Sequence, residues 1–204
     1  MAWHGLCNMG QQQSIRAKHH VAWLENKACN VYTQFGEDGL IATVFERIGT
    51  TNRQCFEIGA ADGLFFSNTL RLREQGWRAC LLEKDRLLFN KLVSAYGRDA
   101  ACYWGQCSNL NQPLKDAGFN RKCDFGVIDI DGQDFYLWED LTDFQPRVML
   151  VEISTNGTME PPPERFSETG QAGLDAIKTL GESKGYTLVA ETFCNALFVD
   201  NDEL

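Results

Sequence analysis

The stretch that decides the fold of this 204-residue chain is Cys55-Phe56-Glu57-Ile58-Gly59-Ala60-Ala61-Asp62-Gly63. It begins as a short, mostly apolar run that is typical of a buried strand, and its glycines predict a tight turn where that strand ends. In an open α/β sheet, ligands bind beyond the carboxyl ends of the strands, where glycine lets a nucleotide approach the backbone. The stretch has neither the G-x-G-x-x-G spacing of dinucleotide-binding proteins nor the G-x-x-x-x-G-K-[ST] spacing of phosphate loops. It therefore indicates either a nucleotide site of another kind or a turn that needs glycine only for its shape.

Apolar runs of the same kind recur along the rest of the chain, with helical spacing before and between them. Strands that are apolar on both faces belong in a parallel sheet covered by helices. The last two runs are joined by only a few residues, so they must pair antiparallel. The pattern predicts an α/β fold, a doubly wound, mostly parallel seven-stranded sheet that ends in an antiparallel hairpin. The predicted strands are 55–58, 79–82, 101–104, 126–130, 148–153, 187–190 and 196–199, and the predicted helices are 37–48, 67–75, 85–96, 135–141 and 172–183.

The domain organisation follows from where this pattern starts. Residues 1–30 show no clean periodicity, and we interpret them as an N-terminal tail or accessory segment. Residues 31–204 are long enough to bury a full hydrophobic core, so we interpret them as one domain that carries the function.

Composition and charge exclude several classes of function. The chain has 19 Lys and Arg against 28 Asp and Glu, a net charge of −9, which argues against a nucleic-acid binder. No apolar run is long enough to span a membrane, and the first ten residues lack a secretory signal, so we expect a cytoplasmic protein. The three histidines all lie before residue 21. A general base in the domain must therefore be a carboxylate, Lys, Tyr or a metal-bound group.

The eight cysteines are spaced without any C-x-x-C pair. In a cytoplasmic chain this spacing favours buried thiols over a disulfide framework. We therefore expect eight free thiols, and Cys102 with Cys107 is the alternative pair.

An acidic residue closes the second predicted strand, in Leu81-Leu82-Glu83-Lys84-Asp85. At that place in an α/β sheet, a carboxylate can accept hydrogen bonds from both hydroxyls of a ribose. Taken alone, Glu83 is equally consistent with a solvated strand end. Its position one strand–helix unit after the glycine-bearing turn favours the ribose interpretation.

Together these segments resemble a known family. Residues 55–85 look like the S-adenosylmethionine (SAM)-binding half of class I methyltransferases, and more narrowly like the FkbM-type group, which carries E-x-G-A-x-D-G, then S-N-T, G-W and an acidic strand end. Residues 32–39 are similar to the Q-x-G-E-D segment of related sequences, and residues 128–134 to their D-x-D/E-G block. The resemblance covers residues 32–200 and implies the Rossmann-like methyltransferase fold. The cofactor residues that it implies are Glu57, Gly59, Ala60, Asp62, Gly63, Glu83, Gln106, Ser108 and Asp129.

Acidic residues also follow the fourth and fifth predicted strands. Asp129 and Asp131 alternate, so they leave opposite faces of an extended segment, and Glu152 ends the next strand. We predict Asp131 and Glu152 as catalytic residues that take a proton, with a Mg²⁺ site built from Asp131, Glu152 and Asn156 as a second form of the hypothesis. The alternative is turn chemistry, in which Asp134 only caps the helix that follows.

The resemblance implies a SAM-dependent methyltransferase, and we expect it to methylate a hydroxyl on a sugar, glycolipid or natural product. A SAM lyase and a silent SAM-binding module are the alternatives. The expected partner is a small-molecule or saccharide acceptor rather than nucleic acid, and the pattern leaves the oligomeric state open.

Overall fold

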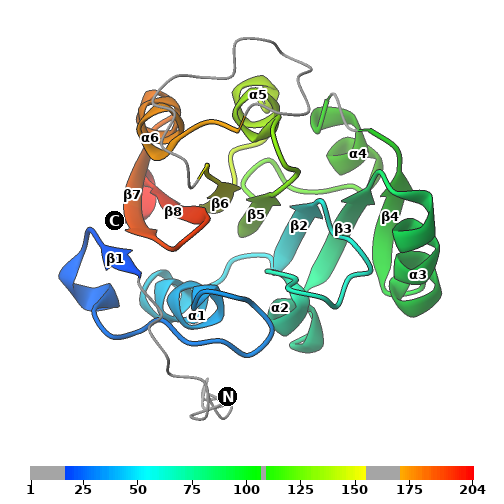
Figure 1. Ribbon diagram of the computed structural model, residues 1–204, viewed down its shortest axis with the longest axis horizontal. Coiled ribbons are helices and arrows are strands. Elements are labelled where there is room, and N and C mark those ends of the chain that lie inside the picture. The colour runs from blue at the N-terminus through cyan, green and yellow to red at the C-terminus, as the bar shows by residue number, and fades with distance from the viewer. Residues whose placement is uncertain (1–16, 107–108, 155–170) are drawn as a thin grey trace.

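The computed structural model describes residues 17–106, 109–154 and 171–204, which form one sheet with helices on both faces (Figure 1). The strand order is β1-β7-β8-β6-β5-β2-β3-β4. The strands are β1 (Lys18–His19), β2 (Gln54–Ile58), β3 (Arg78–Glu83), β4 (Ala100–Trp104), β5 (Phe125–Ile128), β6 (Val148–Glu152), β7 (Tyr186–Glu191) and β8 (Asn195–Asp200). The helices are α1 (Glu37–Ile48), α2 (Leu70–Glu74), α3 (Arg86–Tyr96), α4 (Asn111–Asp116), α5 (Asp134–Asp140) and α6 (Leu174–Ser183), with 3-10 turns at Ala22–Leu24 and Asn201–Glu203.

The sheet confirms the predicted topology. Strands β4, β3, β2, β5 and β6 run parallel, and β8 is antiparallel to both of its neighbours, β6 and β7. The sheet has one strand more than predicted, because β1 pairs antiparallel with the outer edge of β7. A strand of two residues leaves no periodic signal in a sequence, so the pattern could not reveal it.

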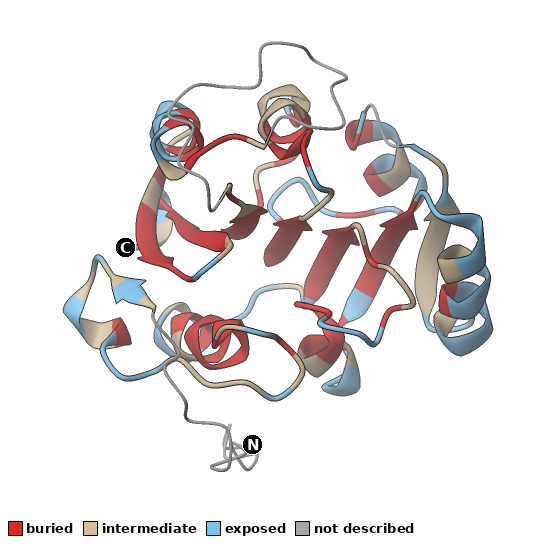
Figure 2. Ribbon diagram, in the orientation of Figure 1, coloured by how far each residue is buried: buried red, intermediate tan, exposed pale blue. Residues whose placement is uncertain are grey.

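The core lies in two layers, one on each face of the sheet (Figure 2). All five residues of β2 are buried, because β2 sits in the middle of the sheet between β3 and β5. Phe56 and its neighbours pack against α4, α5 and α6, with Trp138 and Ile177 at the centre of that layer. Cys55 faces the other layer, which includes Leu92 from α3 and the apolar face of α1. Because successive side chains of a strand point to opposite faces of the sheet, β2 contributes side chains to both core layers.

The described part of the predicted N-terminal segment packs onto the domain. Leu24 is fully buried, and the His20 amide donates to the Val189 carbonyl at 2.9 Å beside β7. Further along, the Gly39 amide donates to the Cys29 carbonyl at 2.9 Å. This hydrogen bond holds the segment around Cys29 against the start of α1. The predicted division at residue 30 stays a prediction, and residues 17–30 are ordered by contacts with the core.

The prediction of eight free thiols is wrong at Cys29, which is disulfide-bonded. Its partner is not among the other described cysteines, because Cys55, Cys80, Cys102, Cys123 and Cys194 are all free. Disulfide formation depends on the approach of two side chains in space, which sequence spacing does not show. Separately, none of the helices in the described ranges is long and apolar enough to cross a membrane.

Candidate functional site

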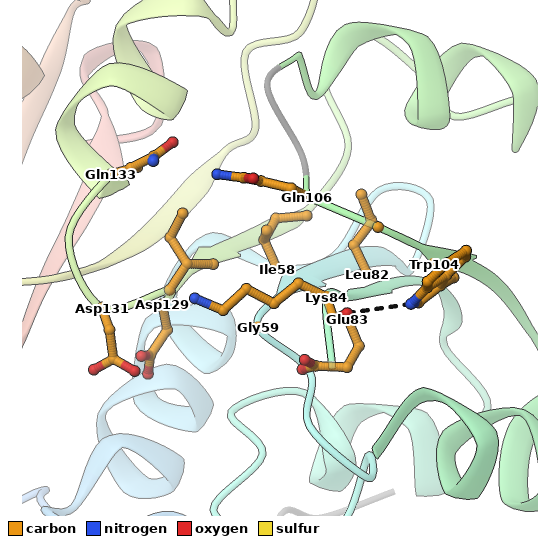
Figure 3. A pocket seen from close by; sticks show the side chains of 12 residues that line it. Ile58, Gly59, Leu82, Glu83, Lys84, Trp104, Gln106, Asp129, Asp131 and Gln133 are labelled. Carbon is orange, nitrogen blue, oxygen red and sulfur yellow. Dashed lines mark hydrogen bonds between the residues drawn. The ribbon is translucent and has the colours of Figure 1, made fainter. Parts of the chain in front are cut away.

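A cavity of about 580 Å³ opens at the carboxyl ends of the central parallel strands (Figure 3). Its volume is within the range of small-molecule and cofactor sites. Strands β2, β3, β4 and β5 all end at its wall, which is where an open α/β sheet binds its ligands. The residues that line it are Ile58, Gly59, Leu82, Glu83, Lys84, Trp104, Gly105, Gln106, Asp129, Ile130, Asp131 and Gln133.

Gly59 forms the floor of the cavity. Its φ of +81° lies in the left-handed region, which glycine adopts without strain. The amides of Gly59 and Ala60 both donate to the Leu82 carbonyl at 3.0 Å, so the turn after β2 is fastened to the end of β3. At Gly59 the backbone itself lines the cavity, because glycine has no side chain.

Glu83 is held in place by two backbone amides. The Ala61 amide donates to its Oε2 at 2.8 Å, and the Asp85 amide donates to its Oε1 at 2.7 Å. The carboxylate is buried yet lines the cavity. Each carboxylate oxygen has a second lone pair. Glu83 can therefore accept two further hydrogen bonds from neighbouring hydroxyls of a ligand in the cavity.

Glu57 lies beneath the loop that follows β2 and is not among the residues that line the cavity. Its carboxylate accepts hydrogen bonds from the Ser67 hydroxyl at 2.6 Å, the Thr69 hydroxyl at 2.6 Å and the Asn68 amide at 2.8 Å. Three donors account for both oxygens of a fully buried acid. Glu57 therefore holds the loop that follows β2 in its conformation. Its predicted contact with a cofactor stays a prediction.

The remaining predicted residues of this loop also bind the loop itself. Asp62 accepts hydrogen bonds from the amides of Leu64 and Phe65, at 3.0 and 2.9 Å, and these bonds lower the pKa of its carboxyl group. Gly63 has a φ of +77°, and its backbone packs against α3. Arg73 donates to the Gly63 carbonyl from below. Ala60, Asp62 and Gly63 thus build the turn, and Gly59 alone of the turn reaches the cavity wall.

Apolar side chains line part of the cavity wall, which we call the apolar slot. Ile58 is the last residue of β2 and Leu82 is the second-to-last residue of β3 (Figure 3), and Ile130 also lines the cavity. Trp104 closes the slot, and its indole nitrogen donates to the Lys84 carbonyl at 3.2 Å, drawn as the dashed line. Gln106 offers an amide at the same end, while the predicted Ser108 lies outside the described residues.

Carboxylates gather at the opposite end of the cavity, where Asp129 and Asp131 line the wall and Glu152 is their neighbour but not itself a lining residue. Asp129 and Glu152 hydrogen-bond to each other through their side chains, and the Asp131 amide donates to Glu152 Oε2 at 3.0 Å. Burial, and then the charge of Glu152, raise the pKa of Asp129 well above its ordinary value. Burial also raises the pKa of Glu152. The structure therefore brings together Asp129, Asp131 and Glu152. Asp129 and Glu152 form a pair with raised pKa values, and Asp131 is the more exposed third member.

Asp134 supports this cluster from behind. It is the first residue of α5, and its carboxylate accepts from the amides of Ile130 and Gly132 at 2.9 and 3.0 Å. It therefore braces the turn that carries Asp131 rather than capping the amides of its own helix. Burial, and then the charge of Glu152, raise the pKa of Asp134 to about 7.

The predicted metal site is incomplete in the structure. Asp131 and Glu152 are neighbours, while Asn156 lies outside the described residues. Among the residues that the structure describes, no group of three or more His, Cys, Asp or Glu side chains is arranged to hold a metal ion.

The hairpin of β7 and β8 closes the acidic end of the site. Its turn is tied to α1, because Glu37 Oε1 accepts from the Thr192 hydroxyl at 2.6 Å and from the Asn195 side-chain amide at 3.2 Å. Burial and the charges of Glu37, Asp129 and Glu152 raise the pKa of the Cys194 thiol to about 12, which places this turn beside the acids. Phe193, on the same turn, is 62% exposed and stacks against Phe35 with ring centroids 5.0 Å apart.

Sequence reasoning missed several residues of the cavity wall: Ile58, Leu82, Lys84, Trp104, Gly105, Ile130 and Gln133. The apolar ones look like core residues in a sequence. Lys84 had a usable signal, because it directly follows Glu83 at the end of a strand.

Comparison with known proteins supports the fold. The sequence matches no family model and no curated protein. The carbon methyltransferase of CurJ is 13% identical with a TM-score of 0.52, over 79% of this chain and 52% of that chain, so the match spans about half of the CurJ structure. The N-terminal domain of EvdMO1, solved in the presence of S-adenosylhomocysteine (SAH) and D-fucose, is 15% identical with a TM-score of 0.48, over 80% and 82% of the two chains. A SAM-dependent methyltransferase from Aquifex aeolicus is 11% identical with a TM-score of 0.45, over 78% and 88%. At 13% identity the likeness to CurJ concerns the fold alone, which is the Rossmann-like methyltransferase fold.

Proposed function

We propose that this chain is a SAM-dependent methyltransferase that acts on a hydroxyl group. The observation that carries the proposal is Glu83, fixed by two backbone amides with its free lone pairs at the wall of a 580 Å³ cavity. In this fold such a carboxylate is positioned to bind a ribose. The carboxylates at the other end of the same cavity supply groups that can take a proton.

The residues of the cavity offer a place for each part of SAM. Glu83 would accept hydrogen bonds from the ribose hydroxyls, and the bare backbone of Gly59 would lie against the methionine part. The apolar slot next to Trp104 and Ile130 would hold the adenine, with Gln106 at its edge. Asp129 and its neighbours would face the positively charged sulfur, which negative side chains stabilise.

When bound, SAM supplies a methyl group on a positively charged sulfur, which an acceptor oxygen can attack. The work of the chain is to hold that oxygen in line and to take its proton, because a hydroxyl is a poor nucleophile at neutral pH. No histidine is found among residues 21–204. The carboxylates beside the cavity are therefore our candidates for the base.

Glu152 is the strongest candidate for the base, with Asp129 as its hydrogen-bonded partner. A carboxylate of raised pKa holds a proton better near neutral pH, and this suits it to accept one from a substrate. Asp131 retains its proposed catalytic role at the cavity wall, and its amide orients Glu152. In the metal form of the hypothesis, Asp131, Glu152 and Asn156 would instead hold Mg²⁺ and polarise the hydroxyl.

A saccharide or another small polyol is the acceptor class that the site favours. Such a molecule offers hydroxyls to carboxylates and an apolar ring face to an aromatic side chain. Both features are present at the acidic end of the site, where Glu152 is close to the turn that carries the exposed Phe193.

Calorimetry with SAM and SAH, followed by mass analysis after adding a panel of monosaccharides and small phenols, tests this function. SAH formed only when an acceptor is present, together with a product 14 mass units heavier than the acceptor, would support it. Consumption of SAM without an acceptor would show a lyase, and binding without turnover on any acceptor would show a silent binding module. No binding of either ligand would overturn the proposal.

A further inference from the structure

We propose that Lys84 sets the charge selectivity of the cofactor cavity. Its ammonium group weakens the binding of SAM, which carries a net positive charge, relative to SAH, which is neutral overall. The rate of the enzyme would then depend on the ratio of the SAM and SAH concentrations, because the product SAH competes well with SAM for the cavity. This inference rests on the proposed function.

Lys84 lies inside the cavity rather than on an unrelated surface. It directly follows β3 and lines the same wall as Glu83. Figure 3 shows its side chain extending from the end of β3 across the cavity, with the amino group pointing toward the side where Asp129 and Asp131 lie. That path runs from the proposed ribose site toward the proposed site of the charged sulfur.

The positive charge of Lys84 is not paired with a carboxylate of the described residues. Among the described residues that line the cavity, Lys84 is the one cation, beside Glu83, Asp129 and Asp131. No ion pair joins its ammonium to a carboxylate of the described residues, whereas other lysines such as Lys18 and Lys115 have one. An ammonium that no carboxylate neutralises acts on any charged ligand that enters the same space.

The backbone of Lys84 is fixed, so this charge stays near the site. Its carbonyl accepts the hydrogen bond from the Trp104 indole, and Glu83 on one side is held by two amides. On the other side, Asp85 caps α3 by accepting from the amides of Leu87 and Leu88. The side chain can change its rotamer, but its charge remains at the wall of the cavity.

The size of the effect on SAM binding follows from the distance between the Lys84 ammonium and the sulfonium charge within one cavity. Repulsion between two unit charges a few ångströms apart, in the mixed dielectric near a protein surface, changes a dissociation constant by about three- to tenfold. SAH lacks the sulfonium charge and escapes this penalty. Salt screens charges that are exposed to solvent, so the effect should shrink at high ionic strength.

The test is the ratio of the dissociation constants of SAM and SAH, measured by calorimetry for the wild type, Lys84→Met and Lys84→Arg. The ratio should fall about threefold or more in Lys84→Met and keep its wild-type value in Lys84→Arg. Lys178→Met is the matched control, because it removes one positive charge from the exposed face of α6 and should leave the ratio unchanged. In 1 M salt, the wild type and Lys84→Met should show nearly the same ratio.

Equal ratios for the wild type and Lys84→Met at low salt would overturn the inference while leaving the proposed function intact. Failure of the wild type to bind either ligand would instead remove the proposed function itself. A second measurement is inhibition by SAH during turnover, which should weaken in Lys84→Met relative to the Michaelis constant for SAM by the same factor.

Discussion

The carbonyl oxygen of Asp129 occupies the space that a side chain at Gly59 would need. A Cβ built on Gly59 would lie 1.8 Å from that oxygen, far inside van der Waals contact. Gly59 and Asp129 directly follow the neighbouring strands β2 and β5, and the Asp129 amide also donates to the Ile58 carbonyl at 3.1 Å. The glycine therefore allows β2 and β5 to converge where the cavity begins.

Gly59→Ala should destabilise the fold strongly, by about 3 kcal/mol or more, because the backbone carbonyl of a paired strand cannot move aside. Gly76→Ala is the matched control, because its φ is also +81° but nothing lies within 4 Å of its Cβ position. Its cost should be the conformational strain alone, about 1 kcal/mol. Urea unfolding measures both. Equal losses in the two variants would show that the contact with Asp129 does not matter.

Glu83→Ala should weaken SAM binding by about 1.5–3 kcal/mol, the value of hydrogen bonds to a charged group. It should also lower the melting temperature, because the amides of Ala61 and Asp85 lose their acceptor. Calorimetry and thermal unfolding separate the two effects. Glu46→Ala, on the exposed face of α1, should change neither. An unchanged affinity in Glu83→Ala would reject the ribose assignment.

Glu152→Gln should lower turnover about 10²-fold or more while SAM binding stays nearly intact, because an amide cannot take a proton. In the wild type, the rate should fall as the pH drops through the pKa of the pair, which lies above that of an ordinary carboxylate. This comparison needs a verified acceptor and single-turnover kinetics. Asp131→Asn tests whether that side chain takes part in proton transfer as well.

Chelation distinguishes the two forms of this catalytic hypothesis. A carboxylate base should be insensitive to EDTA, whereas a metal site at Asp131 and Glu152 should lose activity and regain it with Mg²⁺ or Mn²⁺. Normal turnover in both amide variants would mean that the acids serve only the turn.

The stability of the protein should depend on pH through Asp134. Its pKa in the folded protein is about 7, against an ordinary value of 3.8, so between these values the folded state holds a proton that the unfolded state has lost. The free energy of unfolding must then fall as the pH rises, by up to about 1.4 kcal/mol per pH unit from this group. The loss should be complete above about pH 7 and absent below about pH 4.

Urea unfolding of the wild type and Asp134→Asn between pH 4.5 and 7.5 measures this dependence. The wild type should lose stability relative to the variant, because asparagine does not titrate. Asp175→Asn, at an exposed position of α6, should follow the wild-type curve. Parallel curves for the wild type and Asp134→Asn would contradict the raised pKa.

Most of the sheet could be predicted because its strands are short apolar runs separated by turn residues. The seven predicted strands agree with β2–β8 within two residues at each end. Helix α4 was missed because Asn111, Gln112 and Pro113 fill its first turn and give no apolar periodicity. Helix α2 starts at Leu70 instead of residue 67, because Ser67 and Thr69 bind Glu57. No pattern in a sequence shows that contact, which joins residues ten and twelve positions apart.

Site residues could be predicted where a glycine or a polar side chain follows or ends a predicted strand. Gly59, Glu83, Gln106, Asp129 and Asp131 were all expected there, and all line the cavity. Their contacts were not predictable, because the burial that raises the pKa values of Asp129 and Glu152 arises only when the chain folds.

The two residues of β1 also bear on how the protein behaves in concentrated solution. An outer strand such as β7 exposes unpaired amides and carbonyls, and these can recruit a strand from another molecule and begin aggregation. Here β1 pairs with Ala190 and Glu191 at the end of that edge, and Lys18 forms an ion pair with Glu191 at 2.6 Å. A very short strand with a charged, exposed side chain offers little template for further pairing. This small element therefore protects the sheet from growing past its last strand.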